Sequence, residues 1–282
     1  MSTTPRMPDD ASSVGRLLQH WRKTRRKSQL SLALSAGVSA RHVGFVEIGR
    51  ANPSREMVML LAGVLDVPLR DRNTLLLAAG YAPVYRETGL EAPEMAQAKK
   101  AVDLILAHQE PYPAVVMDRY WNIVRTNGAG ERFFARLLEG APPVAAPNVV
   151  RLMFDPAGLR PHVANWEAVA QALVQRVHRE ALGGTPDERT QALLDEVLAQ
   201  PGVPEHFRTP DLLAAFPAPF LSIQFRKGAL AMDYFSTVTT LGTPQDAMLQ
   251  EIRVESFHPA DARTATAGPV PGSRSPAGRS GG

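Results

Sequence analysis

Residues 28–55, SQLSLALSAGVSARHVGFVEIGRANPSR, constrain the fold more than any other part of the chain. Two short amphipathic segments flank Gly37, which stands where a turn with positive φ is expected. Ser28 and Ser39 precede the two segments and can cap them as helices. The pattern predicts two short helices joined by a tight turn. A generic helical hairpin would show the same periodicity of apolar residues.

Three further helices are predicted around this pair. One is expected over residues 14–26, and the cations at its end suit the helix dipole. Ser54 caps another over residues 55–65, and a last one covers residues 70–79 before a glycine. Five short helices with glycine-bearing turns predict a small all-α bundle over residues 13–80.

Charge is distributed unevenly along the chain, although its net charge is only +3. Residues 1–80 contain twelve Lys and Arg against six Asp and Glu, whereas residues 81–260 contain sixteen against twenty-one. A cationic region of this size is expected where a domain meets phosphates. A solvated charged surface would give a weaker form of the same pattern.

The spacings SQ-x-x-x-A-x-x-x-GVS, E-x-G-R and PS within residues 28–55 resemble the helix-turn-helix transcription regulators of the Cro/C1 (XRE) family. The resemblance extends from residue 14 to about residue 80. It implies an all-α, five-helix, lambda-repressor-like domain that binds double-stranded DNA, with an ion pair between Arg22 and Glu47. The implied base-reading residues are Ala40, Arg41, His42, Gly44 and Phe45. The implied phosphate contacts are Gln29, Ser39, Arg50, Asn52 and Arg55.

Physical chemistry agrees with these assignments. Arginine suits bidentate recognition of guanine, so Arg41 is the strongest base-reading candidate. Amide, hydroxyl and guanidinium contacts to phosphates fix the position of a protein without reading sequence. The alternatives are a solvated surface cation for Arg41 and packing against the fourth helix for Phe45. Because the recognition helix lacks the two glutamines of some repressors, the operator sequence does not transfer.

A second domain is predicted over residues 95–260, after a proline-bearing linker at 81–94. Helices are expected at 94–108, 165–181 and 185–199, and their alternation with strands predicts an α/β (α+β) sheet covered by helices. Residues 1–12 and 261–282 are polar or rich in small residues and are expected to be a disordered lead and tail. The strand candidates are 114–117, 121–126, 220–226, 230–239 and 251–257.

Four runs of this region resemble the MmyB-like ligand-binding domain: PAVVMDRYWNIVRTN at 113–127, NVVRLMFDP at 148–156, NWE from 165, and the threonines at 237, 240 and 243. The resemblance implies a PAS-like sheet around an apolar pocket for a small apolar effector of fatty-acid type. Candidate cations for a ligand carboxylate are Arg119, Arg125 and Arg151. Aromatic residues that line such a pocket, or belong to an ordinary core, are Trp121, Phe133, Phe134, Phe154, Trp166, Phe225 and Phe235.

Composition excludes several kinds of chemistry. The chain has no cysteine, so disulfides and cysteine-ligated metals are excluded, which fits a reducing cytoplasm. No phosphate-binding loop, nucleophile elbow or helical histidine pair is present, so neither a metal, a cofactor nor an enzyme activity is expected. The N-terminus does not resemble a signal peptide, and no apolar run is long enough to span a membrane.

The combined prediction is a cytoplasmic transcription regulator that binds DNA as a homodimer and responds to an apolar effector through its second domain. Two alternatives remain for that domain: a metabolite-modifying enzyme tethered to DNA, or a module that only dimerises.

Overall fold

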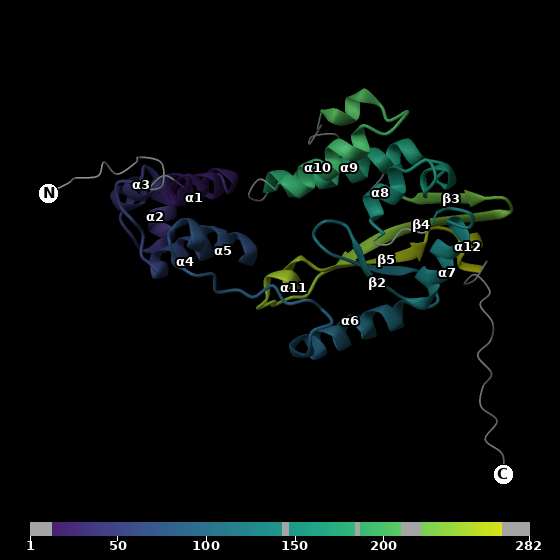
Figure 1. Ribbon diagram of the computed structural model, residues 1–282, viewed down its shortest axis with the longest axis horizontal. Coiled ribbons are helices and arrows are strands. Elements are labelled where there is room, and N and C mark those ends of the chain that lie inside the picture. The colour runs from purple at the N-terminus through teal and green to yellow at the C-terminus, as the bar shows by residue number, and fades with distance from the viewer. Residues whose placement is uncertain (1–12, 143–146, 184–186, 210–220, 267–282) are drawn as a thin grey trace, which may run out of the picture. The chain divides into compact units, whose positions relative to one another are not determined.

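The computed structural model describes residues 13–142, 147–183, 187–209 and 221–266. The chain folds into two compact units, which Figure 1 shows as ribbons. The helical unit consists of the chain up to Gly89 and the segments Glu180–Asp187 and Gly242–Gln250. The sheet unit consists of the remainder. The multi-domain architecture predicted from the sequence is therefore confirmed.

The helical unit contains the five predicted helices, with ends that differ from the expected ones by one or two residues. Ser28, Ser39 and Ser54 each precede a helix, and each hydroxyl oxygen accepts a hydrogen bond from the backbone N–H three residues later, at 3.0–3.2 Å. Gly37 adopts a φ of 66° in the turn that the sequence predicted. The helices are α1 (Ser13–Thr24), α2 (Gln29–Ala36), α3 (Ala40–Glu47), α4 (Arg55–Val64) and α5 (Leu69–Ala78).

The core of the helical unit is apolar and closely packed. Trp21, from α1, is completely buried at its centre. The first turn of α1 lies directly against the end of α3, because Gly15 has no side chain to separate the two backbones. Other buried core residues are Val14, Leu18, Leu32, Val43, Val46, Val58, Leu61, Leu65, Leu75 and Leu76.

The segment Gly242–Gln250 also belongs to the helical unit, and it begins the short helix α11 (Ala247–Glu251). Pro68 precedes α5 and provides no side-chain cap. Instead, the Oε1 atom of Gln250 accepts a hydrogen bond of 2.7 Å from the backbone N–H of Leu69. The carboxylate of Asp246 accepts from the N–H of Thr88 at 3.0 Å and from that of Met248 at 2.9 Å. Gln250, which is 181 positions further along the chain than Leu69, thus caps the start of α5.

The sheet unit is built on one antiparallel sheet with the strand order β2-β1-β5-β4-β3. Each of the five predicted strands is present, but the second and the last begin two residues later than predicted and the third begins at Ile223. Helix α11 occupies the residues just before the last strand. Phe220, the expected first residue of the third strand, lies outside the described residues. The strands are β1 (Ala114–Met117), β2 (Ile123–Thr126), β3 (Ile223–Lys227), β4 (Leu230–Thr239) and β5 (Arg253–Pro259).

Helices cover this sheet on both sides. In Figure 1, α8 and α9 lie above the sheet, and α6 lies below it. The apolar run that begins at Asn148 is the helix α8. Short 3-10 turns occupy Pro93–Met95, Arg160–His162 and Glu205–Arg208. The helices of the unit are α6 (Ala96–Gln109), α7 (Gly128–Leu137), α8 (Val149–Phe154), α9 (Trp166–Gly183), α10 (Glu188–Leu198) and α12 (Ala262–Thr266).

Helix α12 lies inside the segment that the sequence predicted to be disordered. Thr264 is buried, and its hydroxyl accepts a hydrogen bond of 2.9 Å from the N–H of Asp233 on β4. The Asp261 carboxylate caps the helix by accepting from the N–H of Thr264 at 2.6 Å. Composition did not reveal this helix because its contacts are polar and are made with a distant strand.

Candidate functional site

Helix α3 has one buried face and one accessible face. Val43, Val46 and Glu47 are buried, as the periodicity predicted. Arg41 is exposed, and its guanidinium carbon lies 5.1 Å from the ring centroid of Phe45, one turn further on. The ring therefore supports the arginine while leaving its donors accessible. The remaining base-reading candidates, Ala40, His42 and Gly44, are partly exposed.

Glu47 is the centre of a hydrogen-bonded cluster that connects three helices. Arg22 of α1 donates to its two carboxylate oxygens from Nε at 2.6 Å and from Nη2 at 2.8 Å. Gln29 of α2 donates from Nε2 at 2.8 Å. The structure thus contains the Arg22–Glu47 ion pair that the resemblance implied, and it adds Gln29 to that pair.

The cluster controls the ionisation of Glu47. Burial raises the pKa of this carboxyl, and the hydrogen bonds from Arg22 and Gln29 outweigh burial, so that the pKa lies below its ordinary value. The hydrogen bond with Glu47 also raises the pKa of the Arg22 guanidinium. The pair therefore remains ionised at neutral pH and holds α1 against α3.

The phosphate-contact candidates lie at the starts of α2, α3 and α4 and in the loop between α3 and α4. Arg50, Asn52 and Arg55 are exposed. Ser39 is exposed as well, and its hydroxyl accepts the 3.1 Å hydrogen bond that caps α3. Gln29 uses one amide donor within the unit and is only partly exposed. Helix α3 and the loop that follows it thus carry several accessible hydrogen-bond donors.

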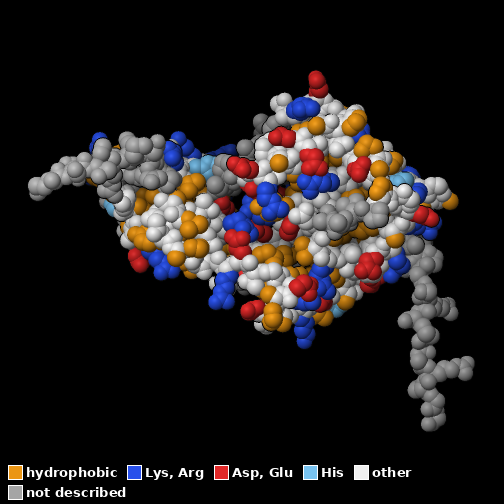
Figure 2. Space-filling model, in the orientation of Figure 1, with side chains coloured by type: hydrophobic (Ala, Val, Ile, Leu, Met, Phe, Trp, Pro, Cys, Tyr) orange, Lys and Arg blue, Asp and Glu red, His pale blue; other side chains and the backbone are white. Residues whose placement is uncertain are grey.

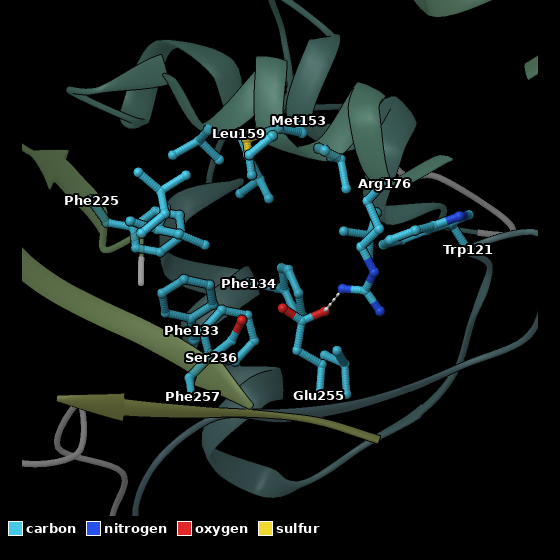
Figure 3. A pocket seen from close by; sticks show the side chains of 17 residues that line it. Trp121, Phe133, Phe134, Met153, Leu159, Arg176, Phe225, Ser236, Glu255 and Phe257 are labelled. Carbon is cyan, nitrogen blue, oxygen red and sulfur yellow. Dashed lines mark ion pairs between the residues drawn. The ribbon is translucent and has the colours of Figure 1, made fainter. Parts of the chain in front are cut away.

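A cavity of about 250 Å³ opens in the sheet unit between one face of the sheet and the helices α7, α8 and α9. Its walls are mostly aromatic and aliphatic, as Figure 3 shows from close by. Three neighbouring strands contribute side chains that extend toward this space: Val115 from β1, Ser236 from β4, and Glu255 and Phe257 from β5. The other lining residues are Trp121, Phe133, Phe134, Val149, Met153, Leu159, Val169, Ala172, Leu173, Arg176, Leu221, Ile223 and Phe225.

Two opposite charges lie together at one end of the cavity. Arg176 of α9 faces Glu255 of β5 with Nη1 and Oε2 3.9 Å apart, as the dashed line in Figure 3 marks. Trp121 lies beside them, and its ring centroid is 4.6 Å from the Arg176 guanidinium carbon and 4.3 Å from that of Arg253. The cavity thus has a mostly apolar lining and a polar end.

Two asparagines hold the helical walls of the cavity in place. The Oδ1 of Asn127 accepts from Gly130 at the start of α7 and from Ala114 on β1, at 2.8 and 3.0 Å. Asn148 caps α8 and donates to the carbonyl of Tyr120 at 2.7 Å, beside Trp121. These side chains fix Phe133 of α7 and Met153 of α8 relative to the sheet.

Comparison with known families agrees with both units. A helix-turn-helix family model matches residues 18–71, and a model of the MmyB-like transcription regulator ligand binding domain matches residues 98–267. The chain belongs to the MmyB-like transcription regulators. It is a DNA-binding regulator with a ligand-binding domain, as the sequence predicted. No curated protein was found to match this regulator. Among the described residues, no helix is long and apolar enough to cross a membrane.

The cavity of this MmyB-like regulator corrects part of the predicted lining. Trp121, Phe133, Phe134 and Phe225 line it. Phe154, Trp166 and Phe235 are not among the lining residues. Phe154 is fully buried and packs edge-to-face on Trp166, with ring centroids 5.7 Å apart. Phe235 stacks on His258, with ring centroids 5.2 Å apart. Phe235 precedes Ser236 on β4, so its side chain points to the opposite face of the sheet.

None of the three arginines considered as carboxylate partners lines the cavity. Arg119 pairs with Glu251 at 3.0 Å, Arg125 with Glu91 at 2.7 Å, and Arg151 with Glu196 at 2.8 Å. The cavity cation is Arg176, which the sequence analysis did not single out. Arg176 follows Val169 by seven residues, or about two helical turns, and so lies on the apolar face of the predicted helix. This position was the one signal in the sequence that could have placed Arg176 at the cavity.

Proposed function

We propose that this regulator reads a specific DNA sequence through α3 and that an apolar, fatty-acid-like effector in the sheet-unit cavity changes its affinity for DNA. The observation that carries the proposal is the mostly apolar cavity, which lies in the same chain as a helix-turn-helix. A cavity of about 150 Å³ can hold benzene, and this one of about 250 Å³ accommodates a larger apolar molecule.

The DNA-binding form in this proposal is a cytoplasmic homodimer. Helix-turn-helix dimers bind two half-sites whose centres lie about 10 bp apart, and the symmetry of the operator mirrors that of the protein. Arg41 reads base edges, supported by Phe45, while Gln29, Ser39, Arg50, Asn52 and Arg55 hold the position on the backbone. The exposure of Arg41, Arg50, Asn52 and Arg55 supports these roles.

Replacing Arg41 with alanine is expected to weaken binding to the selected operator by about tenfold to a hundredfold, because a bidentate arginine–guanine contact contributes about 1–3 kcal/mol of discrimination. The operator is first obtained by in vitro selection from random DNA, and affinities are then measured by fluorescence anisotropy. Binding to unrelated DNA is expected to fall much less.

Arg55→Ala is the matched control. It removes a cation expected to touch phosphate, so affinity falls for all sequences, and the slope of log K against log salt is reduced by about one. Failure to enrich any sequence over bulk DNA would rule out the proposed regulator function. Equal losses for Arg41→Ala on specific and unrelated DNA would instead remove Arg41 from the base-reading residues.

Coupling between the cavity and DNA is proposed to pass along the chain from β5 to α11. Glu255 lines the cavity, and the strand that carries it begins two residues after the end of α11. Gln250, in α11, caps α5 of the helical unit. An effector that shifts β5 therefore acts on the support of α5, and the same interaction free energy acts in reverse when DNA binds.

Gln250→Ala is expected to leave effector affinity nearly unchanged while reducing the effect of the effector on DNA affinity by at least half. The substitution removes the α5 cap, which costs about 1 kcal/mol of helical-unit stability, so both measurements are made well below the unfolding transition. The control is Gln191→Ala, which removes a side-chain hydrogen bond on the exposed surface of α10. An unchanged effector response in Gln250→Ala contradicts this route.

A further inference from the structure

We infer that Arg41 and Phe45 together read one step of the operator: Arg41 binds a guanine, and the ring of Phe45 contacts the methyl group of a thymine in the neighbouring base pair. This inference rests on the proposed function of α3 as the DNA-reading helix and adds part of the sequence that it reads. It follows from the exposure, spacing and bonding of two side chains on the outer face of α3.

Phe45 is an aromatic side chain that the core of the helical unit does not use. Among the described residues, the partly buried apolar side chains that pack on this core include Ala40 and Ala51, on either side of it, but not Phe45. The Phe45 side chain is itself only partly buried. Aromatic rings contribute strongly to interfaces when a partner covers them, so the position of this ring favours contact with a bound partner.

Arg41 lies beside this ring and keeps its hydrogen-bond donors accessible. The two residues are four positions apart on α3 and therefore share one face of the helix. The guanidinium carbon of Arg41 lies 5.1 Å from the centroid of the Phe45 ring. Arg41 is exposed, and no hydrogen bond or ion pair joins its side chain to another residue in the described part of the chain. Its guanidinium donors can therefore all serve a bound partner.

The backbone of α3 fixes the direction in which this pair points. Val43 and Val46 are buried on the opposite side of the helix. Behind the ring, the Phe45 carbonyl accepts hydrogen bonds from the backbone N–H groups of Arg50 at 2.8 Å and of Ala51 at 3.1 Å. These contacts close the end of the helix without using a surface side chain. The guanidinium and the ring are thus presented together on the accessible face.

The contact between the two groups restricts which base pairs they reach. A guanidinium carbon within about 6 Å of a ring centroid is in cation–π contact with that ring. No base pair fits between two groups that touch each other in this way. Arg41 and Phe45 therefore meet neighbouring base pairs, and they read a two-base step rather than two separated positions.

The chemistry of the two side chains selects the bases. Arginine donates to the O6 and N7 atoms of guanine, and thymine is the base that presents a methyl group in the major groove. An aromatic ring gains from contact with that methyl group. Cytosine at the same place lacks the methyl group and presents an amino donor, which the ring of Phe45 cannot accept and would leave unpaired. The pair therefore favours guanine beside thymine.

The test uses the full chain and altered bases in its selected operator. In vitro selection is expected to enrich a guanine next to a base pair that contains thymine in each half-site. Uracil in place of that thymine removes only the methyl group, so affinity is expected to fall about fourfold per half-site. In place of the guanine, 7-deazaguanine lacks the N7 acceptor, so affinity is expected to fall by about fivefold or more per half-site. Fluorescence anisotropy measures both losses.

Two substitutions then assign each loss to one side chain. Phe45→Ala is expected to bind the thymine and uracil operators equally, and Arg41→Ala is expected to bind the guanine and 7-deazaguanine operators equally. Ile48→Ala is the matched control, because Ile48 is an apolar side chain that is 58% exposed at the end of the same helix. It is expected to keep both losses, since recognition helices contact bases mainly through their N-terminal residues.

The outcomes separate this inference from the proposed function. An operator without such a step, or a native affinity that neither altered base changes, overturns the inference and leaves α3 as the DNA-reading helix. A methyl effect that disappears in Ile48→Ala and persists in Phe45→Ala overturns it as well. Enrichment of no sequence over bulk DNA overturns the DNA-reading function itself. Each ratio compares two DNAs on one protein, so partial unfolding of a variant does not change it, and the native protein alone decides if a variant does not fold.

Discussion

Replacing Arg22 with methionine is expected to lower the free energy of unfolding of the helical unit by about 3–5 kcal/mol at pH 7, because the buried Glu47 carboxylate loses its ionic partner. The Glu47 side chain is 1% exposed, and Arg22 supplies two of its hydrogen bonds. The remaining hydrogen bonds, from the amides of Gln29 and Gln19, come from neutral groups and do not balance the charge. Urea denaturation followed by circular dichroism measures the loss.

The pH dependence of this effect has a defined sign. In the native protein the pKa of Glu47 lies below its ordinary value of 4.5. The stability that the ion pair contributes is therefore fully present above the unfolded-state pKa, and it is lost as the pH falls through the lower folded-state pKa. Without Arg22, burial raises the pKa of Glu47, and the variant relieves the penalty by taking up a proton.

The cost of Arg22→Met is accordingly expected to shrink as the pH is lowered from 7 toward 4. The double variant Arg22→Met/Glu47→Leu is the control, since it removes both charges and is expected to recover most of the stability of the native protein at pH 7. An equal cost at both pH values would show that Arg22 stabilises the unit through packing alone.

Gly15→Ala is expected to destabilise the helical unit by about 3 kcal/mol or more, because over-packing at a close backbone contact forces whole helices apart. A Cβ at this position would lie 2.5 Å from the carbonyl oxygen of Val46 and 2.6 Å from that of Glu47. Both obstacles are backbone atoms, so a change of side-chain rotamer cannot remove them. Helix α1 must move away from α3, and this movement also strains the Arg22–Glu47 pair.

The matched control is Gly63→Ala on α4, where a Cβ would meet no atom within 4 Å. That substitution is expected to stabilise the unit by about 0.5–1 kcal/mol through helix propensity. Thermal unfolding compares the two variants, and operator binding by Gly15→Ala is expected to fall because α3 carries the proposed base-reading residues. A stability within 0.5 kcal/mol of the native protein would contradict the close contact.

The surface of the sheet unit carries charges of both signs. On the face visible in Figure 2, Lys and Arg side chains are interspersed with Asp and Glu over this unit. Within this unit, Arg151 pairs with Glu196 and Arg132 pairs with Glu110.

The sequence alone was sufficient to predict the helical unit almost completely. Its helices are bounded by Ser28, Ser39 and Ser54, whose hydroxyls accept hydrogen bonds from residues three positions away, and by Gly37 with its positive φ. Such signals act over four or five residues and can be recognised in the sequence. The five strands were predicted for a similar reason, since short apolar runs between turn residues are local patterns.

The ligand site depended on tertiary structure. Which aromatic residues line the cavity is decided by the face of the sheet or helix that they occupy, so Phe235 points away while Ser236 points in. Arg176 and Glu255 are 79 positions apart in the sequence and meet only because α9 packs over the sheet at β5.

Short-range capping and periodicity thus determined the helices α1 to α5 and the five strands. Contacts between distant segments determined the rest: the polar end of the cavity, the helix at Ala262–Thr266, and the cap that Gln250 provides for α5. These features depend on side chains meeting across the fold. Their energy comes from burial and from hydrogen bonds between residues whose proximity no local pattern in the sequence records.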